Sequence, residues 1–287
     1  MKLLAKLACA AGIAYATISA AYAGTVINDW YFNPNGTGLA TATKIHENLD
    51  FVGRGLILIT PTGGSTFTFK EFATFAVPQY DGGNFLPTPK FITATFEATG
   101  SGTFSGAFSF NAGGLLKLYS DTLNNFGTGP AGTLGGASDG TKIGTFTTLA
   151  GGGGLVDATG NPVGNGQVTV NTFASAGTLA SGYWFNPSGS QLNSGLAFAF
   201  TNANPVQSPS QQNVATLGCE FAGVTLNGVS CPSGSGFTTA SNPTALFVGN
   251  NGQFKLATVP EPGSLALVSL ALLAVGGIRR YGSSKRA

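Results

Sequence analysis

The sequence predicts an all-β protein: an antiparallel β-sandwich, jelly-roll-like, with an N-terminal signal peptide and a short C-terminal transmembrane helix. Three observations predict this class. Gly (44 residues) and Phe (22 residues) are abundant in a chain of 287 residues with 8% charged residues, a composition that favours strands joined by tight turns. Apolar side chains recur at every second position in short runs. Turn signals separate these runs, and the body has no long segment with the 3.6-residue period of a helix.

The composition also excludes several classes of protein. A hydrophobic content of 43% is too high for a disordered tail, and the low charge argues against a coiled coil or a nucleic-acid binder. Six of the 13 basic residues lie at the chain ends, so the formal net charge of +2 misrepresents the body. Between Gly24 and Val259, 7 basic residues stand against 10 acidic ones. The body is therefore mildly acidic, and no nucleic-acid partner is expected.

Residues 1–23 are predicted to be a secretory signal peptide. Lys2 and Lys6 form its charged start, and an apolar run follows. Ala21-Tyr22-Ala23 then provides the small residues of a cleavage site, so the mature chain is expected to begin at Gly24. The alternative, a retained membrane anchor, is disfavoured because the apolar run is shorter than the ~20 residues that span a bilayer.

Residues 24–258 are predicted to form one Gly- and Phe-rich β domain. Turn signals such as Asp81-Gly82-Gly83 and Asn250-Asn251-Gly252 separate its strands. The continuous apolar run from Leu56 to Ile59 indicates a strand that is covered on both faces. Alternating residues define four further strand faces: Phe104, Gly106, Phe108 and Phe110; Ile92, Ala94, Phe96 and Ala98; Val168 and Val170; and Leu196, Phe198 and Phe200.

Removal of the signal peptide leaves two cysteines, Cys219 and Cys231. An even number of cysteines in an oxidising compartment predicts a disulfide between them, which would stabilise the fold by about 3 kcal/mol. A metal site would need further ligands, and the single histidine, His46, is far away in sequence. No metal and no cofactor are therefore expected.

Residues 259–287 form a distinct C-terminal segment. It begins with Val259-Pro260-Glu261-Pro262-Gly263-Ser264, where two prolines make a stiff, extended and accessible stretch. Residues 265–278 are apolar and rich in Leu and Ala, and they are predicted to form a short transmembrane helix. Arg279 and Arg280 would hold the tail on the cytoplasmic side. The body would then lie outside the inner membrane and be anchored there transiently.

This tripartite pattern resembles the PEP-CTERM sorting signal, which an exosortase recognises. Pro260, Glu261 and Pro262 match its motif residue by residue, and the apolar run with Arg279 and Arg280 follows in the same order. An ordinary single-pass anchor is the alternative. The resemblance implies a Gram-negative cell that makes extracellular polysaccharide, with the body released to, or retained at, the cell surface or matrix.

A pair of aromatic motifs gives the candidate binding residues. Phe32-Asn33-Pro34 recurs as Phe185-Asn186-Pro187, and a Trp and a Tyr precede each copy. The flat faces of these rings could stack on the CH groups of sugars. The alternative is that the rings pack in the core, next to strands that end in Asn-Pro turns. The candidates for glycan stacking are Trp30, Tyr31, Tyr183 and Trp184.

No catalytic residues are predicted. Gly136-Ala137-Ser138-Asp139-Gly140 matches the Gly-x-Ser-x-Gly pattern, but it opens no helix, so we interpret it as a turn. Asp157 and Asn161 flank a turn that lacks the acidic spacing of an EF-hand, which leaves calcium binding open. Glycoside hydrolysis stays an alternative because it needs only two carboxylates; otherwise the acidic residues are expected to face solvent or cap turns. The available carboxylates are Glu47, Asp50, Glu71, Glu97 and Glu220.

Short blocks along the body resemble the flocculation-associated PEP-CTERM proteins. These blocks occur in the expected order: Trp30–Gly36, Ile45–Asp50, Phe110–Gly114, Gly182–Phe185 and Asn250–Phe254. The resemblance implies a non-enzymatic surface or matrix protein that promotes flocculation and biofilm cohesion with exopolysaccharide. Self-association is a further expectation. A carbohydrate-binding module and a secreted glycan hydrolase are the alternatives.

Overall fold

The computed structural model describes residues 25–226 and 244–258. The predicted signal peptide with its cleavage site at Ala23 and Gly24, and the predicted transmembrane helix at 265–278, lie outside these ranges. Within them, no helix is both long and apolar enough to cross a membrane. Residues Val26–Ala257 form one compact unit.

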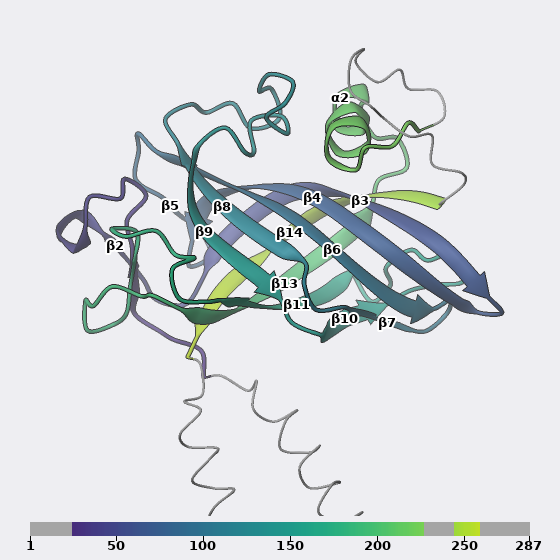
Figure 1. The fold of residues 1–287 in the computed structure, drawn as a ribbon, viewed down its shortest axis with the longest axis horizontal. Helices are drawn as coiled ribbons and strands as arrows, with labels where there is room; N and C mark the ends of the chain where they lie inside the picture. Colours follow the sequence, from purple (N-terminus) through teal and green to yellow (C-terminus); the bar gives the residue numbers. More distant parts are fainter. Residues whose placement is uncertain (1–24, 227–243, 259–287) are drawn as a thin grey trace, which may run out of the picture. The chain divides into compact units, whose positions relative to one another are not determined.

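The described residues confirm the all-β, antiparallel class, with one sheet of 11 strands and another of 3 strands (Figure 1). The small sheet consists of β1 (Trp30–Phe32), β2 (Thr43–Ile45) and β12 (Trp184–Phe185). The strands of the large sheet are β3 (Leu49–Gly63), β4 (Thr66–Tyr80), β5 (Asn84–Phe85), β6 (Phe91–Thr103), β7 (Ala107–Phe110), β8 (Leu115–Asp121), β9 (Thr141–Thr148), β10 (Gly151–Leu155), β11 (Gln167–Ala174), β13 (Gly195–Pro205) and β14 (Thr244–Ala257).

The large sheet closes on itself. Strands β3, β4, β6, β8, β9, β11, β13 and β14 pair in this order, and the pairing of β14 with β3 completes the ring. Opposite walls of the ring face each other across one core, as the two layers of a sandwich do. Ring strands that follow one another in the sequence are also neighbours in the sheet, however. In a jelly roll, by contrast, crossover connections join strands that are not neighbours. The short turns of the sequence explain this meander, because they favour hairpins between consecutive strands.

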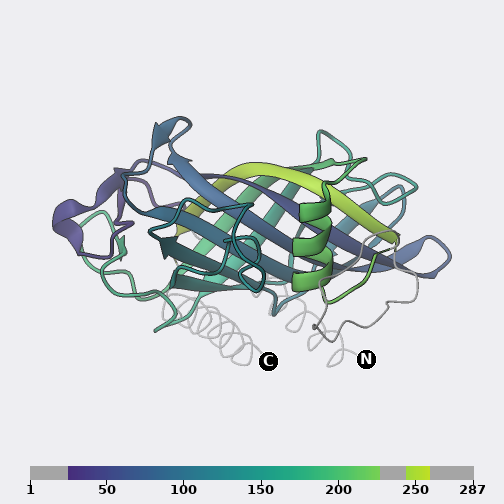
Figure 2. The ribbon, with the colours of Figure 1, turned by 90° about the horizontal axis from the view of Figure 1, so that it is seen from above.

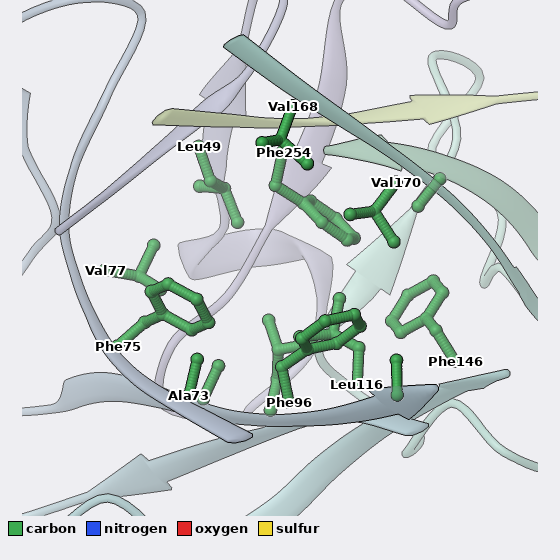
Figure 3. Close-up of a cluster of buried hydrophobic side chains, with 14 of the residues drawn as sticks. Leu49, Ala73, Phe75, Val77, Phe96, Leu116, Phe146, Val168, Val170 and Phe254 are labelled. Carbon is green, nitrogen blue, oxygen red and sulfur yellow. The ribbon is translucent and has the colours of Figure 1, made fainter. Parts of the chain in front are cut away.

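The core lies inside the ring and follows from the alternation of each strand. On β6, Ile92, Ala94, Phe96 and Ala98 are all buried, as predicted, and so are Val168 and Val170 on β11. Figure 3 shows how side chains from different strands converge on this interior. Those labelled there include Phe75 of β4, Phe96 of β6, Phe146 of β9 and Phe254 of β14.

A helical segment covers part of the outer face of the ring. The turn α2 (Gln211–Asn213) continues as the π-helix η2 (Val214–Phe221), which lies above the strands in Figure 1 and crosses them in Figure 2. Leu217 of η2 packs with Leu56 and Leu58, which point outward from β3. The prediction that Leu56 to Ile59 is covered on both faces is therefore confirmed. A separate 3-10 turn, η1 (Leu39–Thr41), follows β1.

Candidate functional site

The two aromatic motifs meet in the small sheet. β1 and β12 are antiparallel, with Phe32 opposite Trp184. The indole rings of Trp30 and Trp184 are stacked, with centroids 6.0 Å apart and an interplanar angle of 16°, and both side chains have 0% exposure. Because protein covers both faces of these rings, no sugar reaches them in this structure, and the core-packing alternative describes them. Tyr31 and Tyr183 are half-buried.

The repeated Asn-Pro dipeptides close two similar turns beside this sheet. The Oδ1 atom of Asn33 accepts a hydrogen bond from the backbone N–H of Asn35 at 2.9 Å. In the second copy, Oδ1 of Asn186 accepts from the backbone N–H of Ser190 at 2.9 Å. Each asparagine thus satisfies the backbone where its strand ends. The repeated motif therefore has a structural role, because its two turns end the strands that contain the stacked tryptophans.

A surface that sequence analysis missed is a groove on the outer face of β11, β13, β14, β3 and β4, with a volume of about 870 Å³. Paired residues form two rows across these strands. In the first row Gln167 lies opposite Asn202, which lies opposite Asn251, which lies opposite Val52. In the second row the successive partners are Thr169, Phe200, Gln253, Asp50 and Gln79. At the usual strand spacing, the second row spans about 19 Å.

Amide side chains dominate the polar part of this groove. None of these amides is hydrogen-bonded through its side chain to another residue of the described ranges. Carboxamides can both donate and accept hydrogen bonds, which suits the hydroxyl groups of a sugar. These amides therefore offer uncharged donors and acceptors that no other described side chain occupies. Its amide residues are Gln79, Gln167, Asn202, Asn251 and Gln253.

An exposed aromatic ring lies among these amides. Phe200 is 45% exposed, and Val52 at the other end of the groove is 50% exposed. Sequence analysis placed Phe198 and Phe200 on an apolar face of their strand. In the structure this face is the outer one, because Ala197 and Ala203 of β13 are the residues buried in the core. The phenyl rings consequently lie on the outer side, where Phe200 provides a flat apolar surface.

The carboxylate in this groove has a structural role. Oδ1 of Asp50 accepts a hydrogen bond from Nδ2 of Asn48 at 2.7 Å, and Oδ2 accepts from the backbone N–H of Gly82 at 2.8 Å. Asp81 in the same region accepts from the backbone N–H groups of His46 and Glu47. Asp50 therefore fixes the loop beside the groove, and it is the groove's single charged residue within the described ranges. This surface suits a neutral, polyhydroxylated ligand better than a phosphate or a cation.

The other candidate carboxylates are scattered, and three of them have their own partners. Glu47 forms an ion pair with Lys255, and Glu97 pairs with Lys117 at 3.7 Å. Glu220 accepts a hydrogen bond from the backbone N–H of Leu134. Glu71 differs from these residues, because it belongs to the inward row of β4 and lines the interior of the ring. The expectation that all of these carboxylates face solvent or cap turns was therefore wrong for Glu71.

The predicted turn residues occupy turns. Asp157 accepts hydrogen bonds from the hydroxyl of Thr159 at 2.8 Å and from the backbone N–H of Asn161 at 2.9 Å. These hydrogen bonds lower the pKa of Asp157 to about 2, and the one from the Thr159 hydroxyl has the largest effect. Residues 136–140 also form a turn, as interpreted from the sequence. Within the described residues, no group of three His, Cys, Asp or Glu side chains is arranged to hold a metal ion.

His46 is an exposed loop residue. Its Nδ1 atom lies 3.0 Å from Oδ1 of Asp29, and Nζ of Lys44 lies 3.2 Å from the same oxygen. The hydrogen bond to Asp29 raises the pKa of His46 and lowers that of the aspartate. This arrangement fits the interpretation of His46 as a polar loop residue.

Cys219 is fully buried in η2. Its predicted partner, Cys231, lies outside the described residues, so the pairing of these two cysteines stays a prediction.

Comparison with known protein families matches residues 258–280 to the PEP-CTERM protein-sorting motif. This match includes Pro260, Glu261 and Pro262 together with Arg279 and Arg280, nearly all of the segment lying beyond the described residues. It confirms the sorting signal predicted from the sequence, which indicates an exported, surface-directed protein that an exosortase processes. No curated protein and no solved structure matches the chain.

Proposed function

We propose that this chain, which carries a PEP-CTERM sorting motif, is a cell-surface or matrix protein that promotes flocculation and biofilm cohesion with exopolysaccharide. The sorting motif at residues 258–280 is the observation that carries the proposal, because a protein that acts on exopolysaccharide outside the cell needs such a surface address. The protein would act by binding and without chemistry. Its mildly acidic, weakly charged body supports this view, since low charge reduces repulsion between copies and permits self-association.

The outer groove is our candidate for the glycan contact. Phe200 supplies an exposed ring face, and Asn251 with Gln253 supplies amides on the neighbouring strand. This arrangement supports the carbohydrate-binding alternative as part of the same function, with the tryptophans holding the fold and the groove holding the glycan. The expected ligand is a neutral stretch of polysaccharide, because the groove contains one carboxylate and that carboxylate is occupied by its own loop.

A binding experiment tests the groove. Mature protein is titrated with exopolysaccharide from the producing strain, and Phe200→Ala and Asn251→Ala are expected to weaken binding by about tenfold each. Matched controls exist for both variants. Phe85, which is 74% exposed, is an aromatic residue outside the groove, and Asn204 is an exposed amide on the same strand as Phe200. Equal affinity in groove variants and controls would remove the groove from the proposal.

A cell experiment tests cohesion. A strain lacking the protein should aggregate less while it still makes polysaccharide, and the wild-type chain should restore aggregation. A variant lacking residues 260–278 should fail to restore it, because it cannot be sorted. Unchanged flocculation in the deletion strain would contradict the proposed function.

The hydrolase alternative is tested with the same purified protein. Polysaccharide is incubated with mature protein, and its chain length is measured over time. Stable chain length is expected. Depolymerisation that disappears when Glu47, Asp50, Glu71, Glu97 and Glu220 are changed to amides in a folded variant would replace binding with catalysis.

A further inference from the structure

The outer groove gathers exposed apolar side chains as well as amides. Four of the nine large apolar side chains that are exposed in the described residues line it: Val52, Leu155, Val163 and Phe200. Leu155 is 55% exposed, and its carbonyl oxygen accepts a hydrogen bond from the backbone N–H of Val163 at 3.0 Å, which keeps these two residues side by side. Exposed apolar side chains that collect in one place indicate a binding surface.

Amide and apolar residues are direct neighbours in this groove. Phe200 of β13 lies opposite Gln253 of β14, and Val52 of β3 lies opposite Asn251 of β14. The Cβ atoms of residues that lie directly opposite each other are about 5 Å apart. Because Asn251 and Gln253 are two residues apart on one strand, both pairs face the same side, about 7 Å apart along β14. The groove therefore repeats one arrangement, an amide beside an apolar side chain.

The charges of the groove restrict the ligand further. Within the described residues no Lys or Arg lines it, and Asp50 is held by Asn48 and by the backbone of Gly82. An acidic or a cationic sugar therefore finds no free counter-charge. A sugar with hydroxyl substituents alone can use the amides but has no methyl group for Val52. The best ligand combines an uncharged donor and acceptor with a neighbouring methyl group.

We propose that the groove recognises N-acetylated amino sugars within the polysaccharide. This inference rests on the proposed function, since it names the sugars that the glycan contact selects. An acetamido group carries one N–H donor, one carbonyl acceptor and one methyl group on adjacent atoms. The carboxamide of Gln253 or Asn251 can pair with its N–H or its carbonyl oxygen, while the methyl group packs on Phe200 or Val52.

Two matched tetrasaccharides test the inference. Chitotetraose and cellotetraose share length and linkage and differ in the acetamido group that replaces one hydroxyl on each sugar. Both are titrated into mature protein, and chitotetraose is expected to bind at least tenfold more tightly. Burial of one methyl group raises affinity about fourfold, and each of the two pairs can bury one. The de-N-acetylated tetramer should bind no better than cellotetraose, because it has the nitrogen without the acetyl group.

Two variants with matched controls make the test specific. Val52→Thr replaces a methyl group by a hydroxyl of similar size and should reduce the preference for chitotetraose over cellotetraose about fourfold. Val206→Thr changes an exposed valine outside the groove and should leave the preference unchanged. Gln253→Glu removes the N–H donors of the amide and should weaken chitotetraose binding about tenfold. Gln212→Glu, at an exposed position outside the groove, is its control.

The outcomes separate this inference from the proposed function. Equal affinity of wild-type protein for the two tetrasaccharides would overturn the selection of N-acetylated sugars. If Phe200→Ala still weakened exopolysaccharide binding in that case, the groove would remain the glycan contact. A preference for chitotetraose that Val52→Thr and Gln253→Glu both leave unchanged would also overturn the inference, because the acetamido group would then bind elsewhere.

Discussion

Glu71 interrupts a regular pattern of inward side chains. Phe67, Phe69, Ala73 and Phe75 occupy the alternate positions of β4 on either side of it, and all are buried. The period of two therefore places Glu71 on the inward face of β4. The sequence thus already indicated that this carboxyl group faces the interior. The number of carboxylates alone does not reveal it, because the inward position shows only when each carboxylate is placed on a strand face.

Stability should depend on pH through Glu71. The usual pKa of 4.5 applies to the unfolded chain, whereas the folded value is about 7, so the folded state holds the proton more tightly. Stability is then greatest below pH 4.5 and falls as the pH rises toward 7, by on the order of 3 kcal/mol. Urea unfolding of wild type and Glu71→Gln from pH 4.5 to 8 measures this difference. Parallel curves for the two proteins would contradict the buried position.

The stacked tryptophans should be essential for folding stability. Trp184→Ala removes a fully buried side chain that contacts Trp30, Phe146 and Phe254, and we expect it to lower the free energy of unfolding by about 3–5 kcal/mol. Tyr31→Ala, in the same small sheet but half-buried, serves as the control and should cost less than half as much. Chemical denaturation of the two variants gives the comparison.

At the scale of elements, the outer face of β3 is exposed at one position and covered at another. Val52 and Leu56 both point outward, yet Val52 is 50% exposed and Leu56 is 0% exposed because η2 covers it. The continuous apolar run correctly predicted this coverage. The identity of the covering segment could not be predicted, because η2 is a short helix of eight residues that has no long periodic pattern.

A pair of charge substitutions tests the contact between η2 and the ring. Leu56→Asp buries an uncompensated carboxylate beneath η2 and should lower the free energy of unfolding by about 3 kcal/mol or more. Val52→Asp introduces the same group on the same face of the same strand, where solvent reaches it, and should change stability by less than about 0.5 kcal/mol. Thermal unfolding of both variants distinguishes these outcomes. Similar losses in both would mean that η2 does not cover Leu56 in solution.

The disulfide between Cys219 and Cys231 is a prediction about the segment that follows η2. The two cysteines are the pair left in the mature chain, and an exported protein rarely keeps free thiols. Denatured, unreduced protein should give no signal with a thiol-labelling reagent. Labelling of both cysteines would show that the pair is reduced.

At the scale of the whole molecule, the sequence correctly predicted a β body followed by a sorting segment. Local patterns defined the strands and turns, because alternation and turn chemistry act over a few residues. Closure of the ring was not predictable in the same way. It depends on β14 pairing with β3, where Phe254 lies opposite Leu49, and no local pattern specifies a contact between residues so far apart.

Processing at both ends should define the mature protein. The motif at residues 258–280 and the predicted site at Ala21-Tyr22-Ala23 imply a product that begins at Gly24 and ends near Pro260-Glu261-Pro262. Intact-mass measurement of protein recovered from the matrix tests this expectation. Recovery of chains that retain residues 265–278 would argue against exosortase processing.

The pairing of the first long strand with the last has a consequence for the order of events during export. Until β14 emerges, β3 and β13 each present a row of unpaired backbone groups, and such edges pair readily with other chains. The sorting motif follows β14 directly, so the chain completes its sheet only as that motif arrives. Chains truncated before Thr244 would keep both edges open and would be prone to join one another. Export of the final strand thus decides whether each copy becomes a closed unit or a seed for aggregation.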